Sequence, residues 1–524
     1  MSVGITRLQS IQIANLALAL FAICSCSWLS CGQAFATGGR DSAASTQSLD
    51  FAANLLHNSN QRRIVMKGLR MATSSTSSTS AKAGTASASQ QSLRPRVAII
   101  GAGAAGLAAA KVFKHSADQK YNVTVFEKDN TIGGVWCYTP KAKDRPMYQG
   151  LRTNLPKEIM AFREFPWTIS GNEDDSQDDK KKKSFISHRQ VRNYLNDYAS
   201  HFELSDCIQL GTTVKQLTVL PPASEEQTNR FSPQWPTIRL DVIKDCKGQS
   251  TDSQTFDAVC VCNGHYSLPV IPDLPGFQEG YYKGKIIHSM EYDNPKDFAN
   301  QTVLCVGGRA SGSDVAREIA QQGGKTHVFL SDTAFVNKED ETNGTPISKY
   351  NVTWVPKTLA ILPDGRVQFD NDCPISPKVD TIIFCTGYDY HFPFINEKSN
   401  VPLDASCRRV TPLYEQLWHA QYPNIAFVGL PHSILPFPFF EFQLQASERL
   451  WRRHGKDFPS PPQLLEAARK DAESGGEGKE NGRVPEDTHY LGSAQWNYCR
   501  KMAKYADIYD DQIENYLATN KVRP

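Results

Sequence analysis

The chain contains no pair of cysteines separated by two residues, although its 524 residues include thirteen cysteines. Zinc sites and redox-active dithiols most often use this spacing, so we expect neither a metal site nor a dithiol centre. Net charge is also small, because 57 lysines and arginines face 55 acids and leave a formal charge of +2. This balance argues against nucleic acid as a partner. The length allows two or three domains of about 100–200 residues each.

Long hydrophobic runs are missing as well. The mainly apolar run from Ile11 to Ile23 is short and interrupted, and nothing after residue 94 has the length and hydropathy of a transmembrane helix. We therefore expect no membrane span in the mature chain. Four cysteines of the folded region stand in short apolar runs, where we expect small buried side chains and not disulfides: Cys260, Cys262, Cys305 and Cys385.

Residues 1–93 have the composition of a targeting leader. Arg7 precedes the apolar run, and Gly32 and Ala34 provide the small residues that a signal peptidase requires. Residues 35–92 are rich in serine, threonine and alanine and contain two acids, Asp41 and Asp50. The same stretch contains six basic residues: Arg40, Arg62, Arg63, Lys67, Arg70 and Lys82. We predict a signal peptide at 1–34 and a transit-like disordered segment at 35–93.

The destination of this leader follows from a resemblance. A signal peptide followed by a basic, hydroxyl-rich segment resembles the two-part plastid presequence of algae with secondary plastids, and GQAFAT resembles its cleavage signature. We therefore predict the plastid of such an alga as the location. Two alternatives stay open: a signal peptide with a disordered linker, which leads to the secretory route and the lumen of the endoplasmic reticulum, and a translation start upstream of Met71 that is wrongly assigned.

The segment RVAIIGAGAAGLAAAKVF carries the strongest local motif. A short apolar strand at 97–100 leads into G-x-G-x-x-G, formed by Gly101, Gly103 and Gly106, and a helix rich in alanine follows. The first glycine permits a tight turn, the second lets the backbone approach a pyrophosphate, and the third lets helix and strand pack closely. A second strand ends at Glu127, 21 residues after Gly106, where a carboxylate would meet a ribose hydroxyl. This context predicts a dinucleotide site.

Two further segments connect this site to a known family. IGGVW at 132–136 and TNLPKEIM at 153–160 resemble the G-G-x-W and flavin-lining motifs of the class B flavin-containing monooxygenases. The helix pattern in SHRQVRNYLNDYASHF is explained by core packing alone, and the DDSQDDKKKK run at 174–183 is typical of a solvated loop. YKGKIIHSMEY matches the family fingerprint F-x-G-x-x-x-H-x-x-x-Y, with Tyr282 in place of phenylalanine. We expect a structural hydrogen-bonding role for His288 in this motif.

A second strand–turn–helix unit, TVLCVGGRASGSDVAREIA, departs from the strict motif because Arg309 takes the place of the middle glycine. Plant-type members of the family have a similar G-x-x-A-S-G loop. We place Asp314 in the first helical turn, where an acid suits the helix dipole. VDTIIFCTGYDYHFPF resembles the family's strand ending in T-G-Y. The resemblance spans about residues 95–510 and indicates a plant- or algal-like branch that oxygenates sulfur or nitrogen.

The resemblance implies an α/β fold with two Rossmann-like dinucleotide-binding domains, both doubly wound parallel sheets, after the disordered leader. The FAD-binding domain would comprise 94–265 and, with a C-terminal extension, 380–524, and the NADPH-binding domain 266–379. By the same resemblance NADPH reduces FAD, O2 adds to give a flavin hydroperoxide, and a soft sulfur or nitrogen nucleophile takes one oxygen atom. The activity would be of the N,N-dimethylaniline monooxygenase type. The candidate cofactor residues are Gly101, Gly103, Ala104, Gly106, Glu127, Val135, Trp136, Thr153, Gly307, Gly308, Arg309, Ser311, Gly312, Asp314, Thr386 and Gly387.

Asn154 is the candidate catalytic residue, because it matches the family's flavin-proximal asparagine and a neutral amide both donates and accepts hydrogen bonds. A turn asparagine before Pro156 is the alternative. Lys157 and Glu158 match the motif but are interpreted as structural. Asp332 stands where the family usually has an arginine suited to a 2′-phosphate, so the choice between NADPH and NADH stays open, with NADPH expected.

Rival functions differ at particular positions. A Baeyer–Villiger monooxygenase has tryptophan where this chain has Tyr292, and a disulfide reductase of similar plan needs the missing C-x-x-C pair. A non-catalytic or merely NADPH-oxidising flavoprotein is disfavoured because the glycine loop, Glu127 and Asn154 are all present. The sequence does not identify the substrate, the choice between sulfur and nitrogen, or the oligomeric state.

Overall fold

The computed structural model describes residues 94–142, 144–167, 184–221, 228–244, 251–277, 280, 282–333, 347–349, 351–405, 409–474 and 489–520. The predicted leader at 1–93 and the charged run at 174–183 lie outside these residues. All described residues belong to one compact unit, Thr85–Pro524.

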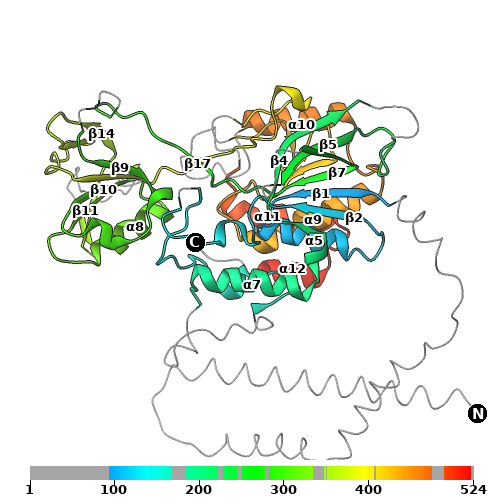
Figure 1. Ribbon diagram of the computed structural model, residues 1–524, viewed down its shortest axis with the longest axis horizontal. Helices are drawn as coiled ribbons and strands as arrows, with labels where there is room; N and C mark the ends of the chain where they lie inside the picture. The colour runs from blue at the N-terminus through cyan, green and yellow to red at the C-terminus, as the bar shows by residue number, and fades with distance from the viewer. Residues whose placement is uncertain are drawn as a thin grey trace, which may run out of the picture. The chain divides into compact units, whose positions relative to one another are not determined.

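The first sheet has the strand order β18-β19-β20-β7-β1-β2-β3. Its parallel part follows from apolar strands buried on both faces, as in Val97–Ile100. Figure 1 shows β7, β1 and β2 side by side. The pairings from β20 to β3 are parallel, whereas β18–β19–β20 is antiparallel. The bounds are β18 (Leu413–Tyr414), β19 (Trp418–His419), β20 (Ile425–Phe427), β7 (Ala258–Val261), β1 (Arg96–Ile100), β2 (Asn122–Phe126) and β3 (Ile208–Gln209).

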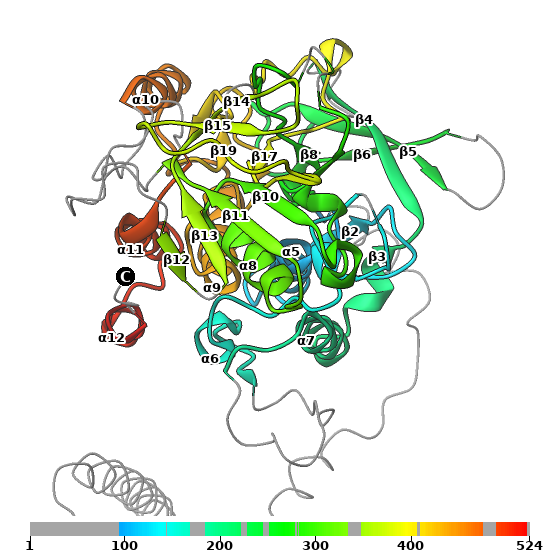
Figure 2. The ribbon, with the colours of Figure 1, turned by 90° about the vertical axis from the view of Figure 1, so that its left-hand side faces the viewer.

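The second sheet has the order β12-β13-β11-β10-β16-β9 and is parallel except at its β12 edge. β16 pairs with both β10 and β9, so this sheet extends to Phe384, past residue 379, where we had expected the second domain to end. In Figure 2, β10, β11 and β13 lie side by side with α8 next to them. The bounds are β12 (Ile347–Lys349), β13 (Val352–Val355), β11 (His327–Ser331), β10 (Thr302–Val306), β16 (Thr381–Phe384) and β9 (Lys285–His288).

The remaining strands form three small sheets. An antiparallel meander contains β4 (Thr212–Leu220), β5 (Thr237–Lys244) and β6 (Thr251–Phe256), and a hairpin contains β14 (Thr358–Ile361) and β15 (Val367–Phe369). β8 (Leu268–Pro269) and β17 (Tyr388–Asp389) pair antiparallel. The chain leaves the first sheet through β8 and returns through β17, so the two segments that connect the large sheets are hydrogen-bonded to each other.

Each of the two parallel sheets has a helix directly after its glycine loop. α5 follows β1 directly and α8 follows β10, which gives each sheet a strand–turn–helix unit. α5 packs against α9 through Phe113 and Trp451, whose ring centroids lie 5.5 Å apart. The bounds are α5 (Ala104–Lys114), α6 (Lys157–Met160), α7 (His188–His201), α8 (Ala310–Ala320), α9 (Pro436–Arg452), α10 (Pro461–Ser474), α11 (Gln495–Tyr505) and α12 (Asp511–Thr519). Short 3-10 turns are η1 (Gly134–Trp136), η3 (Leu204–Cys207), η5 (Ser289–Glu291), η6 (Pro295–Phe298), η8 (Glu397–Ser399) and η9 (Gly492–Ala494).

These elements confirm the predicted α/β fold with two Rossmann-like units. α7 begins with a capping box at Ser187 and buries Val191, Tyr194, Leu195 and Tyr198, as its periodicity indicated. The four cysteines singled out above are buried and unpaired. Within the described ranges, no helix has the length and apolar character needed to cross a bilayer. The same residues contain no cluster of three metal-ligating side chains.

Candidate functional sites at the two glycine loops

The first glycine loop joins β1 to α5, and its two end glycines are required by the backbone itself. Gly101 has φ +101°, and a Cβ added there would lie 2.6 Å from the carbonyl oxygen of Cys262. A Cβ on Gly106 would lie 1.8 Å from the carbonyl oxygen of Gly101. The Gly101 amide donates to the Phe126 carbonyl over 2.8 Å, which ties the loop to the end of β2. Turn and close packing therefore explain the first and third glycines.

Gly103, the middle glycine, has no such requirement. Its backbone is extended (φ −74°, ψ −172°), and an added Cβ would meet only the Gly134 Cα, at 3.6 Å. Residues other than glycine adopt this conformation readily, and a Cβ at 3.6 Å makes an ordinary van der Waals contact, so protein packing gives no reason for glycine over alanine. The position opens α5 at Ala104, whose first turn has no side-chain cap and no acid. Bare amides at a helix N-terminus suit an anion, so the loop fits the pyrophosphate of FAD.

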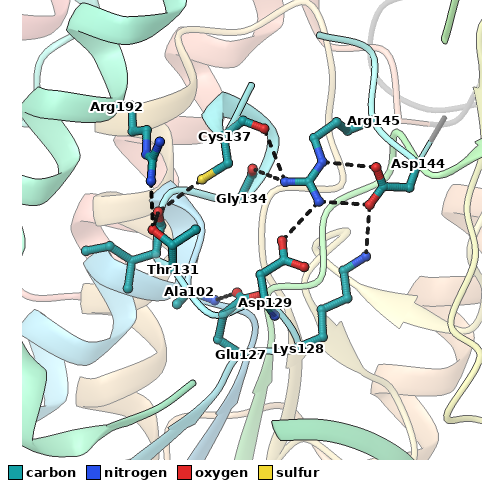
Figure 3. A network of polar contacts seen from close by, with 11 residues as sticks. Ala102, Glu127, Lys128, Asp129, Thr131, Gly134, Cys137, Asp144, Arg145 and Arg192 are labelled. Atoms are coloured by element: carbon teal, nitrogen blue, oxygen red, sulfur yellow. Dashed lines mark hydrogen bonds and ion pairs between the residues drawn. The ribbon is translucent and has the colours of Figure 1, made fainter. Parts of the chain in front are cut away.

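Glu127 places its carboxylate against this loop. Oε2 accepts the Ala102 amide over 2.6 Å, and Oε1 accepts the Asp129 amide over 2.9 Å (Figure 3). The side chain is 5 % exposed, and burial raises the pKa of Glu127. A carboxylate fixed by two backbone amides keeps lone pairs for the hydroxyls of a ribose. Its location fits the role that the sequence predicted.

Arg145 fixes the other side of the loop, a contribution that the sequence analysis missed. Its guanidinium donates to Asp129 over 3.1 Å and to Asp144 over 2.8 Å, and it also reaches the carbonyls of Gly134 and Cys137 (Figure 3). The two carbonyls belong to the first residue of η1 and to the residue that follows it, and η1 contains the candidate residues Val135 and Trp136 in half-buried positions. Arg145 therefore holds η1 against the acidic turn after β2. An arginine in an unpatterned stretch gives no local signal of such a role.

Asn154 is exposed, and among the described residues its side chain makes no hydrogen bond. Its assignment as the residue beside the flavin stays a prediction. Its neighbour Thr153 is buried and serves the protein: Oγ1 accepts the Ile186 amide over 3.1 Å, and the Thr153 amide donates to the Ile186 carbonyl over 2.8 Å. The bracing of Thr153 fixes the backbone on which Asn154 stands.

A buried ion pair anchors the other end of the Asn154 segment. Glu441 of α9 is 3 % exposed and accepts the Arg163 amide over 2.8 Å, with the Arg163 guanidinium Nε at 3.5 Å. Tyr194 donates to the Phe165 carbonyl over 2.6 Å and accepts the Phe162 amide over 2.8 Å. Lys157 and Glu158 begin the short α6 between these anchors, in keeping with a structural role.

The second glycine loop joins β10 to α8 and repeats the geometry of the first. Gly307 has φ +107°, and a Cβ there would lie 2.5 Å from the Cys385 carbonyl oxygen. A Cβ on Gly312 would lie 1.8 Å from the Gly307 carbonyl oxygen. The Gly307 amide donates to the Ser331 carbonyl over 2.9 Å. Arg309 precedes α8 with φ −72° and ψ −168°, nearly the values of Gly103. The same nucleotide-binding backbone therefore occurs twice.

The side chains of the second loop differ from those of the first. Arg309 and Ser311 are exposed at the start of α8. Our placement of Asp314 in the first helical turn is wrong: α8 begins at Ala310, so Asp314 is its fifth residue, and the first turn contains no acid. Asp314 instead forms an ion pair with Arg317 on the same helix. The start at Ala310 puts Asp314 beyond the first turn and so outside the short range of the helix dipole.

The T-G-Y segment lies at the connection between the sheets, and His288 caps the turn that follows β9. The Thr386 hydroxyl donates to the Val270 carbonyl, and the Gly387 carbonyl accepts the Val270 amide over 3.0 Å. His288 caps η5, because its Nδ1 accepts the Met290 amide over 3.1 Å, and burial lowers its pKa. A neutral capping histidine agrees with the structural role expected from the sequence. The geometry shows Thr386 and Gly387 at the carboxyl end of β16.

Residues 138–142 and 144–150 bridge the two Rossmann-like units, which the sequence analysis also missed. The Tyr138 hydroxyl donates to the Asp293 carboxylate over 2.9 Å, and the Gln149 amide donates to the Asp293 carbonyl over 3.1 Å. The Tyr148 and Tyr292 rings meet edge to face, with centroids 5.2 Å apart. This segment leaves η1 beside the first loop and reaches residues beside α8, so it links the two candidate nucleotide sites.

Comparison with known proteins agrees with this geometry. Residues 94–360 match the family model described as flavin-binding monooxygenase-like. The Arabidopsis thaliana flavin-containing monooxygenase FMO GS-OX5 is 34 % identical over 429 residues, which cover 78 % of this chain and 84 % of that protein. FMO GS-OX-like 4 of the same plant is 35 % identical over 362 residues, or 66 % of this chain and 74 % of that protein.

Solved structures give the same result. The S-allyl-L-cysteine S-oxygenase from Allium sativum is similar with a TM-score of 0.67 and 26 % identity, over 82 % of this chain and 93 % of that one. Tmm from Pelagibacter sp. strain HTCC7211 shares the fold at 22 % identity, with a TM-score of 0.62 over 81 % of this chain and 90 % of that one. The paired glycine loops, the ordered motifs and these matches establish that the chain belongs to the flavin-binding monooxygenase-like family.

Proposed function

We propose that the chain is an NADPH-dependent FAD monooxygenase that transfers one oxygen atom of O2 to a soft nucleophile, and that small thioethers are its substrates. The observation that carries the proposal is the duplicated loop geometry, with Gly103 left open in a way that protein packing does not require. Sulfur is favoured over nitrogen because the similar Allium sativum structure is that of an S-oxygenase. Two nucleotide loops in one chain suit one flavin and one nicotinamide nucleotide.

The residues of the first loop would hold FAD through bare helix amides for the pyrophosphate and Glu127 for the ribose. When bound, FAD supplies the redox chemistry, accepting a hydride and activating O2, so no strong side-chain acid or base is required. The protein's tasks are orientation and electrostatics. Asn154 suits both, because its amide donates to and accepts from neighbouring groups and is exposed on a segment fixed at Thr153 and Arg163.

Replacement of Asn154 tests this assignment. In Asn154→Ala we expect normal FAD content and continued NADPH oxidation, while sulfoxide formed per NADPH falls about tenfold or more and hydrogen peroxide takes its place. Asn497→Ala is the matched control, since Asn497 is an exposed asparagine on α11. Liquid chromatography of the sulfoxide together with a peroxide assay measures both products. Unchanged sulfoxide per NADPH in Asn154→Ala would leave Asn154 as a turn residue.

We also propose that residues 1–93 direct the protein to the plastid of an alga with secondary plastids. The support is the composition of the leader: an apolar run, then a basic stretch poor in acids. Fusion of residues 1–92 to a fluorescent reporter should give plastid fluorescence, and residues 1–34 alone should reach only the secretory route. Secretory or cytosolic fluorescence from the longer fusion would contradict the proposal.

A further inference from the structure

An acidic residue follows the second strand of each Rossmann-like unit at the same structural position. The Gly101 amide bonds the carbonyl of Phe126, the residue before Glu127. In the second unit the Gly307 amide bonds the carbonyl of Ser331, the residue before Asp332. Counting from the glycine loop, Asp332 therefore corresponds to Glu127.

The backbone of both acids is fixed in the same way by the neighbouring strand. The Glu127 amide donates to the Gln209 carbonyl over 3.0 Å, and the Asp332 amide donates to the Val355 carbonyl over 3.1 Å. Ser331 adds a buried anchor, since its hydroxyl donates to the Pro356 carbonyl over 2.9 Å. The backbone of Asp332 is therefore held firmly at the carboxyl end of β11.

The two carboxylates also turn toward the same place in their loops. Glu127 reaches the amide of Ala102, the residue after the first glycine. At the corresponding Gly308, an added Cβ would lie 2.5 Å from both Cγ and Oδ2 of Asp332. The Asp332 side chain therefore occupies the place that a side chain at position 308 would need. Gly308 gives the space for it, and the two residues form a matched pair.

We infer that Asp332 is a specificity-determining residue for the coenzyme, and that the second site binds NADH as well as NADPH. A carboxylate at this position accepts hydrogen bonds from the free hydroxyls of an adenosine ribose and repels a 2′-phosphate. Arg309 stands exposed at the N-terminus of α8, where a cation favours any nucleotide phosphate. The opposing charges make the site tolerant of both coenzymes. This inference rests on the proposed function, since it assigns the second loop to the nicotinamide nucleotide.

Calorimetric titration of the FAD-loaded protein with NAD+ and with NADP+ tests the inference without turnover. For the unmodified chain we expect dissociation constants within about tenfold of each other. Asp332→Asn keeps the size of the side chain and removes its charge, so NADP+ should bind more tightly and NAD+ more weakly. We expect the ratio of the two constants to move about tenfold or more toward NADP+. Asp364→Asn is the matched control, because it removes the same charge in the turn between β14 and β15. It should leave the ratio of the two dissociation constants unchanged.

The inference stands if Asp332→Asn moves the ratio by about threefold or more beyond the Asp364→Asn control, and a smaller change overturns it. Binding of neither nucleotide would also overturn it, together with the assignment of the second loop. Failure of the proposed oxygenation is distinguished by a separate readout, since a protein that binds both nucleotides but forms no sulfoxide would contradict the function and leave the specificity of Asp332 intact.

Discussion

The two glycine loops share their backbone conformation and differ in their side chains. Gly106 and Gly312 occupy equivalent places, where an added Cβ would lie 1.8 Å from a carbonyl oxygen in both loops. By contrast, Gly103 of the first loop is matched by Arg309 of the second, with nearly the same φ and ψ. Packing thus requires glycine at positions 106 and 312 but not at position 103, and a motif alone does not distinguish the two classes.

The largest effect should follow substitution at the packing glycines. Gly106→Ala and Gly312→Ala each force a methyl group into a backbone oxygen, which should destabilise the protein by about 3 kcal/mol or more. Thermal unfolding followed by circular dichroism measures this. Gly103→Ala is the control and should unfold at nearly the normal temperature, because its Cβ meets only a 3.6 Å contact. Equal stabilities for Gly106→Ala and Gly103→Ala would contradict the distinction between the two classes.

A bulky residue at the ligand-facing glycine should have the next largest effect. Gly103→Val should fold but lose FAD, since the isopropyl group occupies the space that the pyrophosphate needs. The second loop is untouched, so NADP+ binding should persist. Visible absorbance of the purified protein gives the FAD content, and calorimetry gives NADP+ binding. Full FAD occupancy in Gly103→Val would mean that the pyrophosphate does not approach this position.

A smaller effect is expected at the ribose-binding acid. Glu127→Gln replaces one carboxylate oxygen by an NH2 group. An NH2 group cannot accept a hydrogen bond from the Ala102 amide or from a ribose hydroxyl. FAD should bind about ten- to a hundredfold more weakly, in line with the loss of a charge-assisted hydrogen bond of about 1.5–3 kcal/mol. Flavin fluorescence titration measures the dissociation constant, and an unchanged value would place the ribose elsewhere.

The same acid predicts a pH dependence. Burial raises the pKa of Glu127, so its carboxyl takes up a proton at a higher pH than an exposed glutamate. The ionised form is the better acceptor for ribose hydroxyls, and FAD affinity should therefore fall as the pH is lowered through this raised pKa. Glu127→Gln should lack this component of the pH profile. An identical profile in both proteins would assign the dependence to another group.

Local sequence patterns predicted the parts of the fold that depend on local chemistry. The strand at 97–100, both glycine loops and the buried face of α7 follow from apolar runs, turn glycines and helical spacing. The position of Glu127 was predictable too, because the strand before it fixes the distance from the loop. For His288, the family fingerprint gave the position, and the structure adds the η5 cap.

Contacts between distant residues were not predictable. Arg145 gathers Asp129 and two carbonyls around η1, but its sequence neighbourhood has no periodicity or motif that indicates this. The contact of Tyr138 with Asp293 joins residues 155 positions apart. The start of α8 illustrates a different limit, since it lacks a side-chain cap, and helix boundaries without caps are poorly marked in sequence.

Transfer of an oxygen atom is the central claim, and labelling with isotopically heavy O2 tests it most directly. The FAD-loaded protein should be supplied with NADPH, a small thioether and the labelled gas, and the sulfoxide analysed by mass spectrometry. The account predicts one labelled oxygen atom in each sulfoxide molecule, about one sulfoxide per NADPH consumed, and label in water from the second atom. A sulfoxide with unlabelled oxygen, or NADPH consumption that yields only hydrogen peroxide with every thioether offered, would contradict it.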